Sequence, residues 1–152
     1  MPINWSEADG RPGVAGTRCT CALLRRTARR FTQTYDLALK PAGLRLTQYS
    51  VLANVAQDGG LSITELAERL AMDRTTLTRN LRPMERHGWL RLAPGHDRRS
   101  RAVEITAAGR RTFERAVPLW REAERRVRRT MGRDDAADLR RLLDAAMAST
   151  AE

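Results

Sequence analysis

The feature that most constrains the fold is a helical pattern that runs directly into two alternating segments, over residues 73–106. A helix is predicted over residues 73–87, because apolar residues recur there at steps of three and four and Asp73 stands where a helix cap belongs. Those apolar residues are Leu77, Leu81 and Met84. Residues 89–93 and 101–105 alternate between apolar and polar positions, as half-buried strands do. The sequence therefore predicts a short helix followed by a β-hairpin.

The outer face of this helix and the tip of the hairpin carry a concentrated positive charge. Residues 73–101 hold eight arginines and three acidic residues, a net charge of +5, and the whole chain of 152 residues has +10. Short hydroxyls beside guanidinium groups suit the base edges and phosphates of a DNA major groove. The candidate DNA contacts in this stretch are Arg74, Thr75, Thr76, Thr78, Arg79, Arg82, Asp97, Arg98, Arg99 and Arg101.

A second short helix precedes the first. Ser62 and Glu65 have capping-box spacing at its start, and its apolar face consists of Ile63, Leu66, Ala67 and Leu70. About three residues separate the two helices, which is the helix-turn-helix arrangement, so Ser62 joins the candidate DNA contacts.

Longer helical patterns flank this unit on both sides. Helices are expected over residues 17–42, 48–57 and 107–131, and a last helix is expected after Gly132. The expected N-terminal caps are Thr47 for the second of these helices, Thr106 for the third, and Asp134 or Asp135 for the last. The outer helices carry more apolar surface than a small winged unit covers, which implies a partner. A second copy in a two-fold dimer would cover that surface and hold two recognition helices about one duplex turn apart. An intramolecular three-helix bundle is the alternative.

The expected fold class is mainly α with a small β-hairpin wing. We divide it into a flexible N-terminal arm (1–16), an N-terminal dimerisation helix (17–46), a winged helix-turn-helix DNA-binding domain (47–106) and C-terminal dimerisation helices (107–152).

Charge and apolar patterning limit the class of protein. The sequence pI of about 11.3 favours a polyanionic partner, either nucleic acid or an acidic membrane surface, and solubility alone is a further explanation of the charge. No stretch approaches the roughly 18 apolar residues of a membrane span, and the start lacks the apolar core of a signal peptide, so we expect a cytoplasmic protein. The sequence contains no Gly-rich phosphate loop, no His-Glu-x-x-His motif and no Gly-x-Ser-x-Gly motif, so no catalysis and no cofactor are expected.

Several of these segments together resemble the MarR family of bacterial transcriptional regulators. The matching segments are residues 62–67, 73–79, 88–90, 97–100 and 105–109. The resemblance runs from about residue 17 to the C-terminus, and the wing stretch is its most specific part. It implies a homodimer that represses or activates genes at palindromic operators and is released by a small ligand or an oxidant.

The resemblance also implies a role for the wing. Arg99 stands at the position of the arginine that enters the minor groove, with Asp97 as its ion-pair partner. A narrow minor groove concentrates negative potential and favours a guanidinium group. A solvated hairpin tip is the alternative reading of Arg99.

The sequence leaves open which of two signals, an oxidant or a small ligand, would release the protein from DNA. Cys21 coincides with the reactive cysteine of the organic-hydroperoxide-sensing branch, Tyr35 coincides with a tyrosine that hydrogen-bonds it there, and Arg25 replaces a second such tyrosine. A guanidinium beside a thiol favours the thiolate that peroxides attack, whereas ordinary packing of a free cysteine is the alternative.

The other signal implied by the family is a phenolic or other small acid bound between the dimer helices and the winged domain. Residues available to line such a pocket are Phe31, Tyr35, Tyr49 and Trp120. A metal site is not expected, because the soft ligands Cys19, Cys21, His87 and His96 are scattered over distant elements.

Two non-catalytic readings compete with a sequence-specific regulator. A winged helix can serve only for protein contact, or it can bind DNA without sequence preference, as nucleoid proteins do. A DNA affinity that falls steeply as salt rises would argue against a role in protein contact alone. A preference for one duplex sequence would argue against nucleoid-type binding.

Overall fold

The structure is a computed structural model that describes residues 19–95 and 101–150. In chain order the elements are α2 (Thr20–Leu39), the 3-10 helix η1 (Lys40–Ala42), α3 (Leu46–Asp58), β1 (Leu61–Ser62), α4 (Ile63–Arg69), α5 (Arg74–Arg86), β2 (Leu90–Pro94), β3 (Arg101–Ile105), α6 (Ala107–Met131) and α7 (Arg133–Ala148). The arm predicted for residues 1–16 and the hairpin tip at residues 97–100 lie outside the described residues. None of the helices just named is long and apolar enough to cross a membrane.

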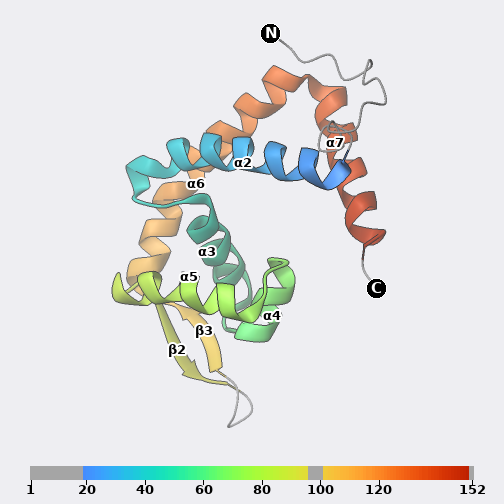
Figure 1. Cartoon of the computed structure of the whole chain (residues 1–152). Helices are drawn as coiled ribbons and strands as arrows, with labels where there is room; N and C mark the ends of the chain where they lie inside the picture. Colours follow the sequence, from blue (N-terminus) through green and yellow to red (C-terminus); the bar gives the residue numbers. More distant parts are fainter. Residues whose placement is uncertain (1–18, 96–100, 151–152) are drawn as a thin grey trace.

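The long helix α6 connects the two ends of the molecule (Figure 1). At its start lie α3, α4, α5 and the strands, which form a winged helix-turn-helix. Farther along, α2 crosses α6, and α7 folds back from its end (Figure 1). The mainly helical fold with a small wing is the one that the sequence predicts.

The sheet has three antiparallel strands in the order β1-β3-β2. Leu90 lies opposite Ile105 and Leu92 opposite Val103, so the two predicted strands pair as a hairpin with their apolar residues facing each other. Strand β1 was not predicted, because two residues are too few to show an alternating pattern.

The core lies where α3, α4, α5 and β3 meet. Its largest fully buried side chains are Leu39, Val51, Leu52, Val55, Leu66, Leu77, Leu81, Met84 and Val103. Burying one such side chain contributes about 1.5 to 3 kcal/mol, so this cluster fixes the rotation of α5 about its own axis.

Three of the predicted caps are present. The Asp73 carboxylate accepts from the Thr76 N–H at 2.9 Å, and the Thr106 hydroxyl accepts from the Gly109 N–H at 3.0 Å. Ser62 and Glu65 form the capping box, in which the Glu65 N–H donates to Ser62 Oγ at 3.2 Å and the Ser62 N–H donates to Glu65 Oε2 at 2.8 Å.

Two predicted caps are wrong. Helix α3 begins at Leu46, before Thr47, because the Leu46 N–H donates to Asp36 Oδ1 at 2.7 Å and a side chain of α2 thus satisfies an open amide. Helix α7 begins directly after Gly132, so Asp134 and Asp135 lie in its first turn. Carboxylates there still interact favourably with the helix dipole.

Candidate nucleic-acid interface

The inner face of α5 is completely buried. Leu77, Leu81 and Met84 expose at most 1% of their surface, so the residues between them are turned outward. Pro83 lies inside α5, and the helix continues through it to Arg86. This packing positions the face that the sequence predicts for DNA.

Helix α5 carries four arginines, and three of them are predicted DNA contacts. Arg74, Arg79 and Arg82 are exposed, and their guanidinium groups form no ion pair with any residue that the structure describes. Arg69 at the end of α4 differs, because it pairs with Asp58. Unpaired guanidinium groups on an exposed helix face can bind phosphates or guanine edges.

The threonine hydroxyls of α5 are not equivalent. Thr76 Oγ1 donates to the Asp73 carboxylate, and Thr78 Oγ1 donates to the Arg74 carbonyl oxygen at 2.7 Å. The hydroxyl of Thr76 and then its amide hold the pKa of Asp73 below its ordinary value. Thr75 is exposed, and its hydroxyl makes no hydrogen bond within the described part of the chain.

Ser62 is half-buried at the start of α4, where its hydroxyl oxygen accepts a helix amide. Its hydroxyl proton remains available to a phosphate oxygen. Ser62 also lies opposite Ala102 in the sheet, so the first helix of the motif is tied directly to the wing.

The described base of the wing carries charge of both signs. Arg91 on β2 pairs with Glu104 on β3 at 2.6 Å, and Arg101 is exposed opposite Pro94. Of the predicted wing contacts, Asp97, Arg98 and Arg99 lie outside the described residues.

The four aromatic residues predicted to line one pocket lie in two places. Tyr49 of α3 contacts Phe113 and Trp120 of α6, with ring centroids 5.4 Å and 5.6 Å apart, and these three rings attach the winged unit to α6. Phe31 and Tyr35 of α2 instead line a cavity of about 150 Å³ between α2, α6 and α7.

An ionic network that the sequence analysis missed borders this cavity. Tyr35 Oη donates to Glu124 Oε2 at 2.5 Å, and the Glu124 carboxylate also pairs with Arg128 at 3.3 Å and with Arg140. Burial and then the hydrogen bond to Glu124 raise the pKa of Tyr35 above its ordinary value. An available signal was that Glu124 competes with Ala123 for one position of the apolar stripe of α6.

The two cysteines are exposed at the start of α2. Tyr35 follows Cys21 by 14 positions on the same helix, about 21 Å along its axis, so within one chain these side chains do not meet. Arg25 is exposed one turn after Cys21. The residues that the structure describes contain no cluster of three or more potential metal ligands among His, Cys, Asp and Glu.

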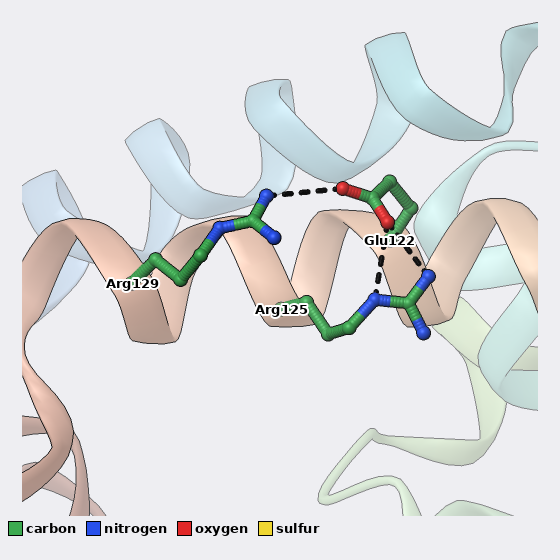
Figure 2. A network of polar contacts seen from close by, with 3 residues as sticks. All are labelled: Glu122, Arg125 and Arg129. Carbon is green, nitrogen blue, oxygen red and sulfur yellow. Dashed lines mark hydrogen bonds and ion pairs between the residues drawn. The ribbon is translucent and has the colours of Figure 1, made fainter.

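A further polar network lies on the exposed side of α6 (Figure 2). The Glu122 carboxylate pairs with Arg125 at 2.6 Å and with Arg129 at 3.1 Å, and these contacts hold the pKa of Glu122 below its ordinary value. Exposed pairs of this kind contribute little to stability, so we read it as a solvated ionic surface.

Comparison with known proteins agrees with this geometry. A family model described as the MarR family matches residues 42–100. The crystal structure of the Mycobacterium tuberculosis transcriptional regulator MosR in complex with DNA has 41% sequence identity and a TM-score of 0.75, over 88% of this chain and 99% of that chain.

Two curated relatives are also regulators. The HTH-type transcriptional repressor Mb2911 of Mycobacterium bovis is 32% identical over 70% of this chain and 78% of its own length. The organic hydroperoxide resistance transcriptional regulator of Bacillus subtilis is 30% identical over 65% of this chain and 68% of its own length. Two other curated regulators match over 66% and 49% of their own lengths. These relatives are named as transcriptional regulators.

Proposed function

Because the chain belongs to the MarR family of DNA-binding transcriptional regulators, we propose that it is a homodimeric repressor that binds a palindromic operator and leaves it when a small ligand or an oxidant reaches the dimer. Its DNA target lies in the bacterial cytoplasm, and the proposal places the protein there.

The observation that carries this proposal is the outer face of α5. The arginines at positions 74, 79 and 82 and the hydroxyl of Thr75 face away from the core without a partner in the described chain. A helix whose inner face is fixed by three fully buried side chains presents these groups rigidly, as base readout requires.

Exposed apolar side chains support the dimer. Large apolar residues exposed by 39% or more lie on α2 and α7, and they are Leu23, Leu24, Leu37, Leu142, Leu143 and Met147. These two helices flank α6 at the end away from the wing (Figure 1). A second copy packed on them would leave both recognition helices free for DNA.

The test begins with selection of bound duplexes from a random pool, followed by titration of the enriched duplex, one half-site and a scrambled duplex. We expect the scrambled duplex to bind at least about a thousandfold more weakly, and affinity to fall steeply as salt rises. Equal affinity for all duplexes would instead favour nucleoid-type binding, and no binding would favour a protein-interaction module. A reporter gene behind the operator then separates repression from activation.

For the small-molecule signal we propose a single-ring acid, such as a phenolic acid, bound beside Phe31 and Tyr35. The cavity volume of about 150 Å³ suits one ring. An acid group there could replace Glu124 as the partner of Arg128 and Arg140. We expect 4-hydroxybenzoate to release wild-type protein from the operator and to act more weakly on Arg140→Gln; no release of the wild type by a panel of such acids would reject this ligand class.

For the oxidant we propose Cys21, assisted by Arg25, because its thiol is exposed and a guanidinium group stands one helical turn away. Any contact with Tyr35 would come from the second subunit. We expect an organic hydroperoxide to release wild-type and Cys19→Ser protein from the operator but not Cys21→Ser. Release of Cys21→Ser at the wild-type peroxide concentration would exclude this role.

A further inference from the structure

The start of α6 is fastened to the end of α5 by one threonine. The Thr106 N–H donates to the Trp89 carbonyl oxygen at 3.0 Å. Its hydroxyl lies 2.5 Å from the Gly88 carbonyl oxygen and 3.2 Å from that of Trp89, and it accepts from the Gly109 N–H at 3.0 Å. Thr106 therefore caps α6 and, with the same hydroxyl, holds the residues that follow α5.

Gly109 brings the two segments into direct contact. It is buried, and a Cβ atom at this position would lie 2.0 Å from the Trp89 carbonyl oxygen. The first turn of α6 thus rests on the same carbonyl group that Thr106 binds. A larger residue could not occupy position 109 without separating them.

Gly88 and Trp89 in turn close the recognition helix. The Gly88 N–H donates to the Glu85 carbonyl oxygen at 2.8 Å, and the Trp89 N–H donates to that of Met84 at 3.0 Å. Gly88 has a φ of 69°, the left-handed conformation that commonly ends helices. Any displacement at Thr106 is therefore transmitted through backbone hydrogen bonds to the last turn of α5.

A second attachment lies farther along α6, where Tyr49 contacts Phe113 and Trp120. Two attachments at different points of one helix prevent the winged unit from pivoting on it. If the first were lost, the three rings and the buried Ala116 would still hold the middle of α6, but the contacts that fix its first turn against the end of α5 would be absent.

We propose that Thr106 and Gly109, which we call the Thr106–Gly109 clamp, are positioning residues that set the half-site spacing that the dimer reads. The inference rests on the proposed function, because spacing has meaning only for a dimer on a palindrome. One added base pair moves the half-sites by about 3.4 Å and rotates them by about 35°, so discrimination requires a winged unit held at a fixed angle.

Two substitutions distinguish the proposed role of the clamp from ordinary capping of α6. Thr106→Ser keeps a hydroxyl that both accepts and donates. Thr106→Asp keeps an acceptor suited to capping α6, but its carboxylate has no proton to donate to the Gly88 carbonyl. The full-length proteins are compared on the selected operator, on operators lengthened or shortened by one base pair, and on one half-site, with sedimentation and thermal melting as checks.

We expect wild-type protein and Thr106→Ser to prefer the selected spacing by about tenfold, the order of loss that one mismatched base pair causes. Thr106→Asp should remain dimeric, bind the half-site within about twofold of wild type, and prefer the selected spacing by less than about threefold. Unchanged spacing preference in Thr106→Asp would overturn the clamp. If this variant does not fold, Gly109→Ala decides in its place, because it keeps the Thr106 hydroxyl that caps α6 and separates the first turn of α6 from the Trp89 carbonyl oxygen. If the wild type itself shows no spacing preference but still prefers the selected sequence, the clamp is overturned and the proposed function stands. The proposed function fails only if all duplexes bind equally or none binds.

Discussion

Arg79 is exposed in the first half of α5, one turn after Thr75, and the N-terminal residues of a recognition helix are those that contact base edges. We predict that Arg79→Ala changes which operator bases are preferred, because a bidentate contact to guanine discriminates by about 1 to 3 kcal/mol. Selection from a random pool with each protein measures this. Arg111→Ala, which removes the same charge from an exposed position on α6, is the matched control and should select the wild-type sequence.

Arg99 belongs to the wing tip, outside the described residues, and its role comes from the sequence. We predict that Arg99→Ala weakens operator binding while the dimer and the melting temperature stay unchanged, because an arginine in a minor groove contacts DNA and not the core. Gel-shift titration and sedimentation check both parts. Loss of folding in this variant would show that the residue is structural.

The chain has only two tyrosines, Tyr35 and Tyr49, and both are largely buried. Burial raises the pKa of each above its ordinary value of 10.0, and the hydrogen bond to Glu124 adds to the shift at Tyr35. A proton held more tightly in the folded state stabilises that state below the ordinary pKa, and this contribution is lost as the pH rises above it. We predict that at pH 10.0 the folded protein shows little tyrosinate absorbance, whereas unfolded protein in urea shows about half ionisation.

At the scale of the elements, the start of α6 allows a prediction of the sign of a stability change. Replacing a helical glycine by alanine normally stabilises a helix by about 1 kcal/mol. Gly109→Ala should instead destabilise the protein, because the new Cβ would lie 2.0 Å from the Trp89 carbonyl oxygen. Thermal melting of wild type and Gly109→Ala measures the sign of the stability change. A raised melting temperature would mean that α6 does not approach Trp89 this closely.

The elements that the sequence predicted well are those in which a cap and a periodic apolar stripe agree. Asp73, Ser62 and Thr106 identified three helix starts, and the stripe of α5 gave its buried face. The start of α3 was misplaced because its amide is satisfied by Asp36, ten residues earlier, and no local pattern reveals a partner on another helix. The network at Glu124 could not be predicted for the same reason, since its partners lie on other helices. Nor could the sequence show that the four aromatic residues lie in two separate places, because their contacts also join different helices.

At the scale of the whole molecule, the exposed apolar residues of α7 predict the assembly. Leu142 and Met147 are 55% and 65% exposed in the single chain. If they lie in a two-fold interface, each substitution counts twice, and the pair Leu142→Gln with Met147→Gln should weaken the dimer by about a hundredfold or more. Sedimentation equilibrium and operator titration measure the effect. Arg141→Gln, on the opposite side of α7, is the control, and a dimer that tolerates the double variant would place the interface elsewhere.

The positive side chains on the outer face of α5 are all arginines, and Lys40, in η1, is the only lysine in the chain. Guanidinium groups keep their charge at any pH that a cell experiences, and the acylation that neutralises lysines does not act on them. Neither a change of pH nor lysine acylation can therefore remove the attraction of these arginines for DNA. For the proposed homodimeric repressor, release from the operator would then come from moving its two recognition helices apart or out of register with the duplex.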